Sequence, residues 1–418
     1  MLHQVKNFFS RTLLFNRTVW LMLIGNFLVR GCYYMAFPFL IMMLHERYQV
    51  GVLEVGSMLA FSAFLGSSLG LYIGYLSDKI GRKVIILFGA LLCIVSFFGM
   101  GMADEVWQFF ISIVLCGIAQ PMIYIPSRAV ISDQLSDKKN REFALSFNYF
   151  VINIGVAVGP LVGGTISLSH PKTVFLTAAC VYAIYSLMCL VALKNKHTSL
   201  YSQTEINFFK TIQTVRQDKA FVIVMMINFL VMFVFAHLDS SLIQVISLSG
   251  AEKSHQIIVN IYLINSLTTV CFQFPLEKWL GHLPLLIRMK IGIALIALAQ
   301  IGFILAPINS LFAWGVAVFM ISMGEAIVFP LMNIQVDRMA PEHLKGVYYG
   351  ATSLFVFGFA CAPIVGGFIL KFWGSTTLFL VCFTLCVFAI ALYRWSEEKK
   401  VQSQSFIDSR IIDSRVVE

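Results

Sequence analysis

A few ionisable side chains interrupt long apolar runs of the 418-residue sequence, namely Arg30, His237, Asp239 and Glu325. Charge is expensive inside apolar surroundings, and charged groups kept there pair with one another, line a wet path or relay protons. A buried carboxylate gains or loses a proton when water or a cation comes near. Glu325 is therefore the first candidate for proton exchange, with Asp239 and His237 as further proton-coupling candidates.

Arg30 has polar neighbours that could bind a small molecule. Asn26 precedes it by about one helical turn, and Tyr33 and Tyr34 follow it by about one turn. The candidate binding residues are Arg30, Asn26, Tyr33, Tyr34, Gln120, Tyr124, Asn148 and Asn153. Such amides and phenols can also be plain interhelical hydrogen bonds. Arg30 could instead form an ion pair that holds two helices together.

The positions of the nine cysteines do not indicate a metal site or a disulfide. All lie in apolar runs, without a CxxC pair or a neighbouring histidine cluster. Free cysteines of this kind behave as small apolar residues. We expect no metal site, no cofactor and no disulfide.

The composition indicates which elements position these side chains. Hydrophobic residues make up 59% of the chain and charged residues 12%, whereas soluble domains carry about a quarter charged residues. This excludes a soluble globular enzyme and a disordered chain. A bilayer span takes about 20 apolar residues. Twelve segments qualify: 18–43, 52–75, 84–103, 106–129, 143–168, 174–193, 221–247, 256–280, 287–306, 310–333, 348–371 and 375–394.

The basic residues predict how these segments are oriented. With both termini in the cytoplasm, 25 of the 30 lysines and arginines fall on the cytoplasmic side and four on the outer side. A bias of this size is a strong positive-inside signal. The net charge of +9 is then a feature of topology and does not indicate nucleic-acid binding.

The two sets of six segments contain a sequence repeat. The pattern Gly155-x4-Pro160-x2-Gly163-Gly164 recurs 203 positions later, from Gly358 to Gly367. Pro126 and Asp133 recur 204 positions later as Pro330 and Asp337. We expect an N-terminal bundle over 1–193, a cytoplasmic linker over 194–220, a C-terminal bundle over 221–394 and a disordered cytoplasmic tail over 395–418. Transporters built from such repeats bind substrate at midplane between the halves.

A short charged turn joins the second and third segments and reads GYLSDKIGRK over 74–83. Gly81 permits the positive φ of a tight reversal. The carboxylate of Asp78 is favoured at a neighbouring helix N-terminus, and the cluster could also pair with Asp133.

This turn resembles the signature G-x-L-S-D-x-x-G-R-K of the major facilitator superfamily, and the helix count, topology and central loop extend that resemblance to the whole chain. In that family the motif forms a cytoplasmic latch that steadies one access state. The resemblance assigns this gating role to Gly74, Asp78, Gly81, Arg82 and Lys83. The second half has Glu277-Lys278-Trp279-Leu280-Gly281 at the corresponding place, so we expect no symmetric latch.

The fifth segment resembles the antiporter motif G-x3-G-P-x2-G-G of the same family. Its Gly155, Gly159 and Gly163 lie on one helical face, where small residues let another helix approach closely. Pro160 adds a weak point to the helix, and Gly164 completes the motif. The family associates this motif with export by antiport. Alternatively, these glycines serve only to pack two helices together and have no role in antiport.

These features predict an all-α multi-pass membrane protein with the major facilitator fold, twelve helices in two pseudo-symmetric bundles, that acts as a secondary transporter and not as an enzyme. Helix 10 and the stretch 148–164 resemble the MdtH-type multidrug and dipeptide exporters. We expect proton-coupled efflux of a drug-like or peptide-like compound by alternating access. The expected partners are membrane lipid, a small-molecule substrate and protons, with a monomer in a bacterial inner membrane.

Other functions remain open at this point. A proton symporter could import a peptide, a metabolite or a metal-chelating small molecule. A membrane sensor or receptor would bind tightly without turnover and leaves Glu325 unexplained. A channel is disfavoured because no filter-like segment or charged ring is visible in the sequence.

Overall fold

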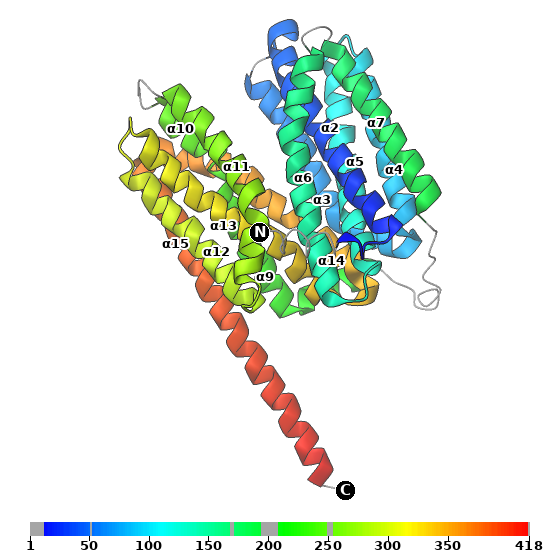
Figure 1. The fold of residues 1–418 in the computed structure, drawn as a ribbon, viewed down its shortest axis with the longest axis vertical. Coiled ribbons are helices and arrows are strands. Elements are labelled where there is room, and N and C mark those ends of the chain that lie inside the picture. The colour runs from blue at the N-terminus through cyan, green and yellow to red at the C-terminus, as the bar shows by residue number, and fades with distance from the viewer. Residues whose placement is uncertain (1–11, 51, 168–170, 194–207, 249–253, 417–418) are drawn as a thin grey trace.

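The computed structural model describes residues 12–50, 52–167, 171–193, 208–248 and 254–416. In these ranges the chain is helical and contains no strand (Figure 1). The predicted all-α membrane fold is confirmed. Within the described residues the twelve apolar segments are helical, with breaks in the segment 221–247 at residues 237–240 and in the segment 348–371 at Thr352.

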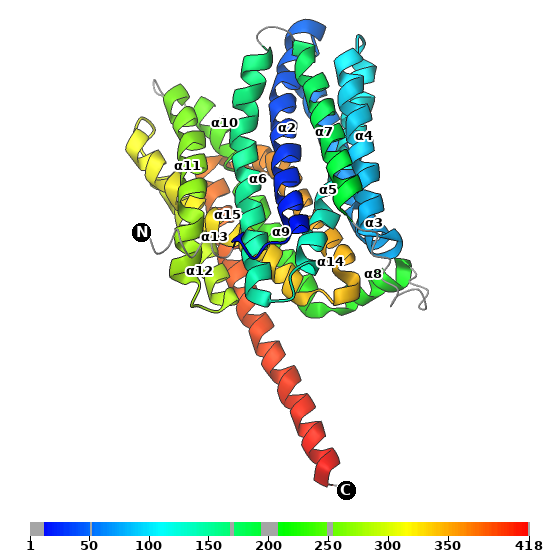
Figure 2. The ribbon, with the colours of Figure 1, turned by 45° about the vertical axis from the view of Figure 1, so that its right-hand side comes forward.

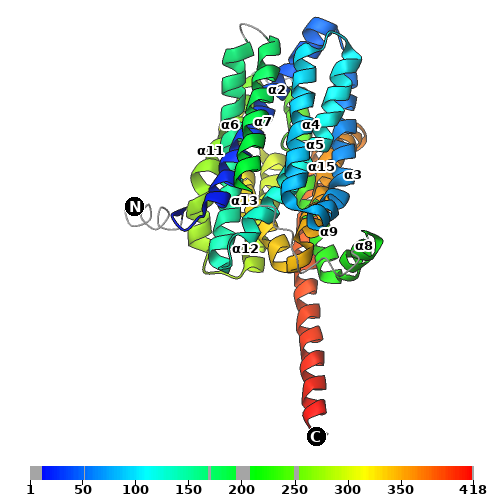
Figure 3. The ribbon, with the colours of Figure 1, turned by 90° about the vertical axis from the view of Figure 1, so that its right-hand side faces the viewer.

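The N-terminal half consists of six long helices. They are α2 (Arg17–Tyr48), α3 (Val52–Ile80), α4 (Arg82–Met102), α5 (Val106–Asp133), α6 (Lys138–Ser167) and α7 (Pro171–Ala192). A short helix of the linker, α8 (Phe208–Gln217), follows and lies beside the lower ends of α3 and α9 (Figure 3).

The C-terminal half contains more breaks. Its elements are α9 (Lys219–Ala236), α10 (Ser241–Leu248), α11 (Ser254–Leu280), α12 (Leu285–Leu305), α13 (Leu311–Met339), the 3₁₀ turn η1 (Glu342–Leu344), α14 (Lys345–Ala351) and α15 (Ser353–Val416). Inside α15, Gly374 has φ 79° and ψ 176° and separates the two helices predicted there.

The seventh segment, predicted as one helix over 221–247, is interrupted between α9 and α10. Asp239, Ser240 and Ser241 follow one another at this point, and side chains of these types compete with the helix for backbone hydrogen bonds. The Ser240 hydroxyl indeed donates to the Ala236 carbonyl at 2.8 Å. Because the residues on both sides of the break are apolar, hydropathy alone does not predict it.

Several helices extend beyond their apolar segments. The helices α3, α5, α6 and α13 run four to six residues past the predicted ends at the end of the bundle that holds the 74–83 turn. A disordered tail was predicted from residue 395 onward, whereas the structure continues α15 to Val416 as a helix that projects from the bundle (Figure 2). Residues 395–416 contain neither Pro nor Gly, so nothing in their sequence stops the helix.

The two halves repeat the same packing. In the N-terminal half α2 packs along α6, and in the C-terminal half α9 packs along α15. Gly155 of α6 faces the backbone of Phe27, and its repeat Gly358 of α15 faces the backbone of Phe229. The halves meet where α3 and α5 contact α14, and where α6 contacts α11 and α13. In Figure 1 they lie close together at the lower end, around α14, and diverge toward the upper end.

Candidate functional site

Glu325 lies near the middle of α13 and is only 7% exposed. Its carboxylate accepts hydrogen bonds from the Tyr149 hydroxyl at 2.9 Å, the Asn265 amide at 2.7 Å and the Thr269 hydroxyl at 3.3 Å. Asn265 and Thr269 come from α11 of the same half, whereas Tyr149 comes from α6 of the other half. The carboxylate therefore bridges the two halves. The sequence identified Glu325 but not Tyr149, whose phenol looks like several others in apolar runs.

Asp239 and His237 lie in the break between α9 and α10, in different surroundings. The Asp239 side chain is exposed and close enough to Glu325 for their charges to interact. His237 is buried, and its Nδ1 lies 2.9 Å from the Ser241 hydroxyl. The His237 ring faces Gly366 of α15. Of these two candidates, Asp239 is the one that the fold brings toward Glu325.

Arg30 contacts aromatic rings. Its guanidinium carbon lies 5.5 Å from the Tyr34 ring centroid and 5.9 Å from that of Tyr33, and Tyr33 in turn stacks on Phe37 at 3.9 Å. Within the described ranges Arg30 forms no ion pair, and its Nε has no hydrogen-bond partner. The structure therefore does not show the alternative, in which Arg30 forms an ion pair that holds two helices together. Cation–π contacts contribute roughly 0.5–2 kcal/mol each.

Gln120 and Tyr124 lie one turn apart on α5 and face different surroundings. Gln120 donates to the Tyr182 hydroxyl at 2.7 Å in the interior of the N-terminal half. The Tyr124 ring lies 5.3 Å from the guanidinium carbon of Arg128. Sequence reasoning missed Arg128, because it stands next to the predicted helix end at 129 and was counted among the basic residues of the cytoplasmic side. It lies inside α5, which continues to Asp133.

The asparagine candidates mostly connect helices. Asn26 donates to Asn148 at 2.6 Å and accepts from the Ser127 hydroxyl at 2.9 Å, which joins α2, α5 and α6. Asn153 donates to the carbonyl of Tyr149 one turn earlier, at 3.1 Å. These contacts orient the helices that carry Arg30, Arg128 and Tyr149.

Asp78 connects the charged turn to the other half. Its Oδ1 accepts from the Gly346 N–H and its Oδ2 from the Val347 N–H, each at 3.0 Å. Both amides belong to the first turn of α14, where N–H groups lack an acceptor within the helix. Arg82 lies 3.7 Å from Asp78 and also pairs with Asp133. We call the side chains of Asp78, Arg82, Asp133 and Lys345, with the two backbone amides, the latch.

The glycines and the lysine of the motif support this arrangement. Gly81 has φ 101°, as the tight reversal requires. Gly74 faces the backbone of Gly346 so closely that a Cβ would collide with it. Lys83 donates to the Leu190 carbonyl at 2.7 Å, within its own half.

More charged contacts cross between the halves at the same end. Lys345 lies 3.7 Å from Asp133 of the other half and 3.1 Å from Glu342 of its own half. Arg141 lies 3.3 Å from Asp337 and 3.4 Å from Glu342. Asp337 is the repeat counterpart of Asp133, so each half supplies one of these two aspartates. The sequence signalled the two aspartates through the repeat and the 74–83 cluster as a partner of Asp133, but it gave no sign of Lys345 or Arg141.

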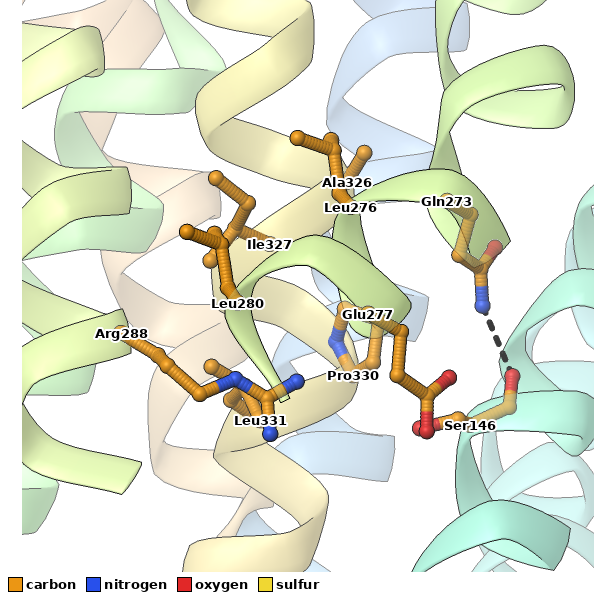
Figure 4. A pocket seen from close by; sticks show the side chains of 10 residues that line it. All are labelled: Ser146, Gln273, Leu276, Glu277, Leu280, Arg288, Ala326, Ile327, Pro330 and Leu331. Atoms are coloured by element: carbon orange, nitrogen blue, oxygen red, sulfur yellow. Dashed lines mark hydrogen bonds between the residues drawn. The ribbon is translucent and has the colours of Figure 1, made fainter. Parts of the chain in front are cut away.

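A small pocket lies beside these contacts (Figure 4). The Gln273 amide donates to the Ser146 carbonyl across the halves at 2.8 Å, and Arg338 pairs with Glu142 at 2.6 Å. The pocket residues are Ser146, Gln273, Leu276, Glu277, Leu280, Arg288, Ala326, Ile327, Pro330 and Leu331. The corresponding segment of the second half, 277–281, thus contributes Glu277 to this pocket.

The glycines of the fifth segment bring α6 against α2. A Cβ on Gly155 would lie 2.8 Å from the Phe27 carbonyl oxygen, and a Cβ on Gly159 would lie 2.9 Å from the Met35 nitrogen. The remaining residues of the motif, Pro160, Gly163 and Gly164, lie in the same helix. The close approach keeps Arg30, between Phe27 and Met35, next to the helix that carries Tyr149.

Comparison with known proteins identifies the family. The family model of the Major Facilitator Superfamily matches residues 22–357. The uncharacterized MFS-type transporter YqjV of Bacillus subtilis is 26% identical over 363 residues, covering 85% of this chain and 87% of the relative. A Na(+), Li(+), K(+)/H(+) antiporter of Planococcus maritimus is 23% identical over 390 residues, covering 84% and 88%. The crystal structure of the human organic anion transporter MFSD10 (TETRAN) shares the fold, with TM-score 0.74, 17% identity and coverage of 90% and 99%. This chain belongs to the Major Facilitator Superfamily and is a membrane transporter.

Proposed function

We propose that this transporter is a proton-coupled exporter of a drug-like or peptide-like small molecule, similar to the MdtH-type branch, and that Glu325 carries the proton. The observation that carries the proposal is the hydrogen bond from Tyr149 of one half to the buried Glu325 carboxylate of the other. A relative named as a cation/H(+) antiporter and the glycine-rich contact between α2 and α6 support antiport.

Ionised and protonated Glu325 differ in how strongly they hold the halves together. A carboxylate accepts charge-assisted hydrogen bonds that are roughly twice as strong as neutral ones. Protonation removes the charge, so the contact with Tyr149 weakens. Proton binding then favours separation of the halves at the latch end, and proton release favours their closure.

The described structure corresponds to one access state. The polar contacts between the halves extend from Tyr149–Glu325 to the latch, and the described residues at the opposite end show none. Because the charge distribution predicts that the latch end is cytoplasmic, we assign an outward-facing state with both termini in the cytoplasm.

The test is Glu325→Gln in proteoliposomes that contain the full chain. Gln cannot ionise, so we expect gradient-driven transport to fall to background while substrate exchange at equal pH continues. Glu54→Gln, an exposed carboxylate of α3, is the matched control and should leave both activities unchanged. Gradient-driven transport by Glu325→Gln at the wild-type rate would exclude Glu325 as the proton carrier.

Proton-symport uptake is the second candidate, and a specific observation favours it. Arg30 has no carboxylate partner within the described ranges, and a proton and an anion can move inward together as a neutral pair. The direction of proton movement distinguishes antiport from symport. Antiport predicts that substrate added to acid-loaded, inside-out vesicles releases protons from the lumen, whereas symport predicts none.

A further inference from the structure

Two arginines lie in the spanning helices of the N-terminal half without an acidic partner. Arg30 is in α2 and Arg128 is in α5. Neither forms an ion pair with any residue in the described part of the chain. An arginine at membrane depth is costly and is ordinarily found facing water, an acidic group or a ligand. Within the described ranges the ion pairs lie at the latch end, apart from the exposed pair of Asp104 and Lys172 at the opposite end.

The fold brings these two arginines together. Asn26, one turn before Arg30, accepts a hydrogen bond from Ser127, the residue next to Arg128, at 2.9 Å. The two guanidinium groups are near enough for their charges to repel each other. Like charges cost free energy when they are held together in a poorly solvated place. An anion between them would remove that cost.

Four tyrosines surround the pair. Tyr33 and Tyr34 contact Arg30, Tyr124 contacts Arg128, and Tyr349 of α14 lies near Arg128 from the other half. Tyr349 is already bonded to Asp337 at 3.2 Å, and Arg141 pairs with that aspartate. Asp337 is therefore engaged elsewhere and does not neutralise the arginines.

The pair faces the space between the halves. The side chains of Arg30, Tyr34, Tyr124 and Arg128 are all partly exposed although they lie inside a bundle. Tyr149, which is bonded to Glu325, lies on α6, the helix that packs along the α2 that carries Arg30 and Tyr34. Guanidinium forks match the geometry of carboxylate and phosphate groups, and aromatic rings suit an apolar or aromatic body.

We propose that Arg30 and Arg128 form the anion-binding part of the substrate site, and that the substrate is an organic anion with an aromatic or apolar body. This inference deepens the proposed transport function and rests on it. It holds for export and uptake alike, because it concerns what is bound and not the direction of movement. An inside-negative membrane potential would assist export of such an anion.

Matched dyes provide the test. Fluorescein and rhodamine 6G share a xanthene core, and the first is an anion while the second is a cation. We expect the purified full chain to bind fluorescein, and Arg30→Gln and Arg128→Gln each to weaken that binding about tenfold, the effect of one hydrogen bond to a charged group. Rhodamine 6G binding should not weaken. Arg216→Gln, on the exposed part of α8, is the control and should match the wild type.

A second measurement does not depend on the choice of dye. A single cysteine placed at Tyr124 in a cysteine-free chain reports the local potential through its rates with an anionic and a cationic methanethiosulfonate. We expect the anionic reagent to be favoured, and Arg128→Gln to lower the ratio of the two rates several-fold. Arg128→Lys should keep most of the ratio and serves as the variant that preserves the fold.

The outcomes separate this inference from the proposed function. If fluorescein does not bind, or binds the wild type and both Gln variants equally, the anion site is wrong even where Glu325 still couples transport to protons. If the Gln variants lose fluorescein binding while Glu325→Gln transports normally, the anion site stands and the proton carrier must be sought elsewhere.

Discussion

At the scale of single residues, burial distinguishes the charged groups that stabilise the contact between the halves strongly from those that stabilise it little. Asp78 has a side chain only 6% exposed and two backbone amides as partners, whereas Glu342 is 73% exposed. Hydrogen bonds to charged groups contribute about 1.5–3 kcal/mol, but exposed ion pairs contribute about 0–1 kcal/mol. Asp78 should therefore control closure of the latch far more than Glu342 does.

The first prediction concerns Asp78→Asn. The amide can accept only one of the two N–H groups of α14 and loses its charge toward Arg82, so closure at the latch end should weaken. We expect turnover to fall several-fold with little change in substrate affinity, measured as transport rate and binding in parallel. Asp104→Asn is the matched control, since Asp104 forms an exposed pair with Lys172. Normal turnover with a large loss of affinity would place Asp78 in the binding site.

Glu342 gives a pH prediction. Burial raises the pKa of this carboxyl, but the hydrogen bond and charge of Lys345 and the charge of Arg141 lower it more, so the net shift is downward. A lowered pKa means that ionised Glu342 stabilises the folded state above its ordinary pKa, and that this contribution disappears as pH falls through the folded-state value.

The measurement is thermal unfolding of wild type and Glu342→Gln across a pH series. The wild type should be more stable by at most about 1 kcal/mol near neutral pH, and the difference should vanish in acid. A difference that grows on acidification would contradict the assigned contacts with Lys345 and Arg141.

The sequence predicted some of the site residues for physical reasons. Glu325 and Arg30 stood out because charge inside an apolar run is rare and costly. Tyr149 and Arg128 did not, since a phenol is common in such runs and a helix boundary cannot be placed to within one turn. The side chains that meet across the halves differ from one access state to another. Their positions in the sequence therefore do not predict these contacts.

At the scale of elements, glycines set the distance between helices. Twelve apolar segments were enough to predict the helices, because hydrocarbon demands both an apolar surface and a satisfied backbone. The break at 237–240 escaped prediction, since its polar residues are few and its flanks remain apolar. The small-residue face of α6 predicted that another helix approaches it closely, and the structure identifies that helix as α2, in contact through the backbone.

The next prediction tests that contact. A Cβ on Gly159 would collide with the backbone of Gly31 and approach the Met35 nitrogen to 2.9 Å. Gly159→Ala should lower the stability by about 1–3 kcal/mol, as overpacking does, and reduce transport. Gly367→Ala is the matched control, because nothing lies within 4 Å of a Cβ there. Equal melting temperatures for the two variants would show that the close approach is not required.

At the scale of the whole molecule, two similar halves meet through a hydrogen bond at mid-depth, which we propose to be controlled by protonation, and through a charged latch at one end. Glu325 and Tyr149 form the first, and Asp78 with α14 forms the second. Weakening one should favour opening at the other, because both act on the same separation of the halves. The repeat predicted the two bodies, and the resemblance of the 74–83 turn predicted the latch.

The most direct measurement is the distance between spin labels at Lys139 and His282, exposed positions on opposite halves at the latch end, by double electron–electron resonance. We predict short distances at high pH, longer distances at low pH, and longer distances at every pH for Glu325→Gln. A single distribution that ignores both pH and the substitution would contradict proton-controlled movement of the two halves.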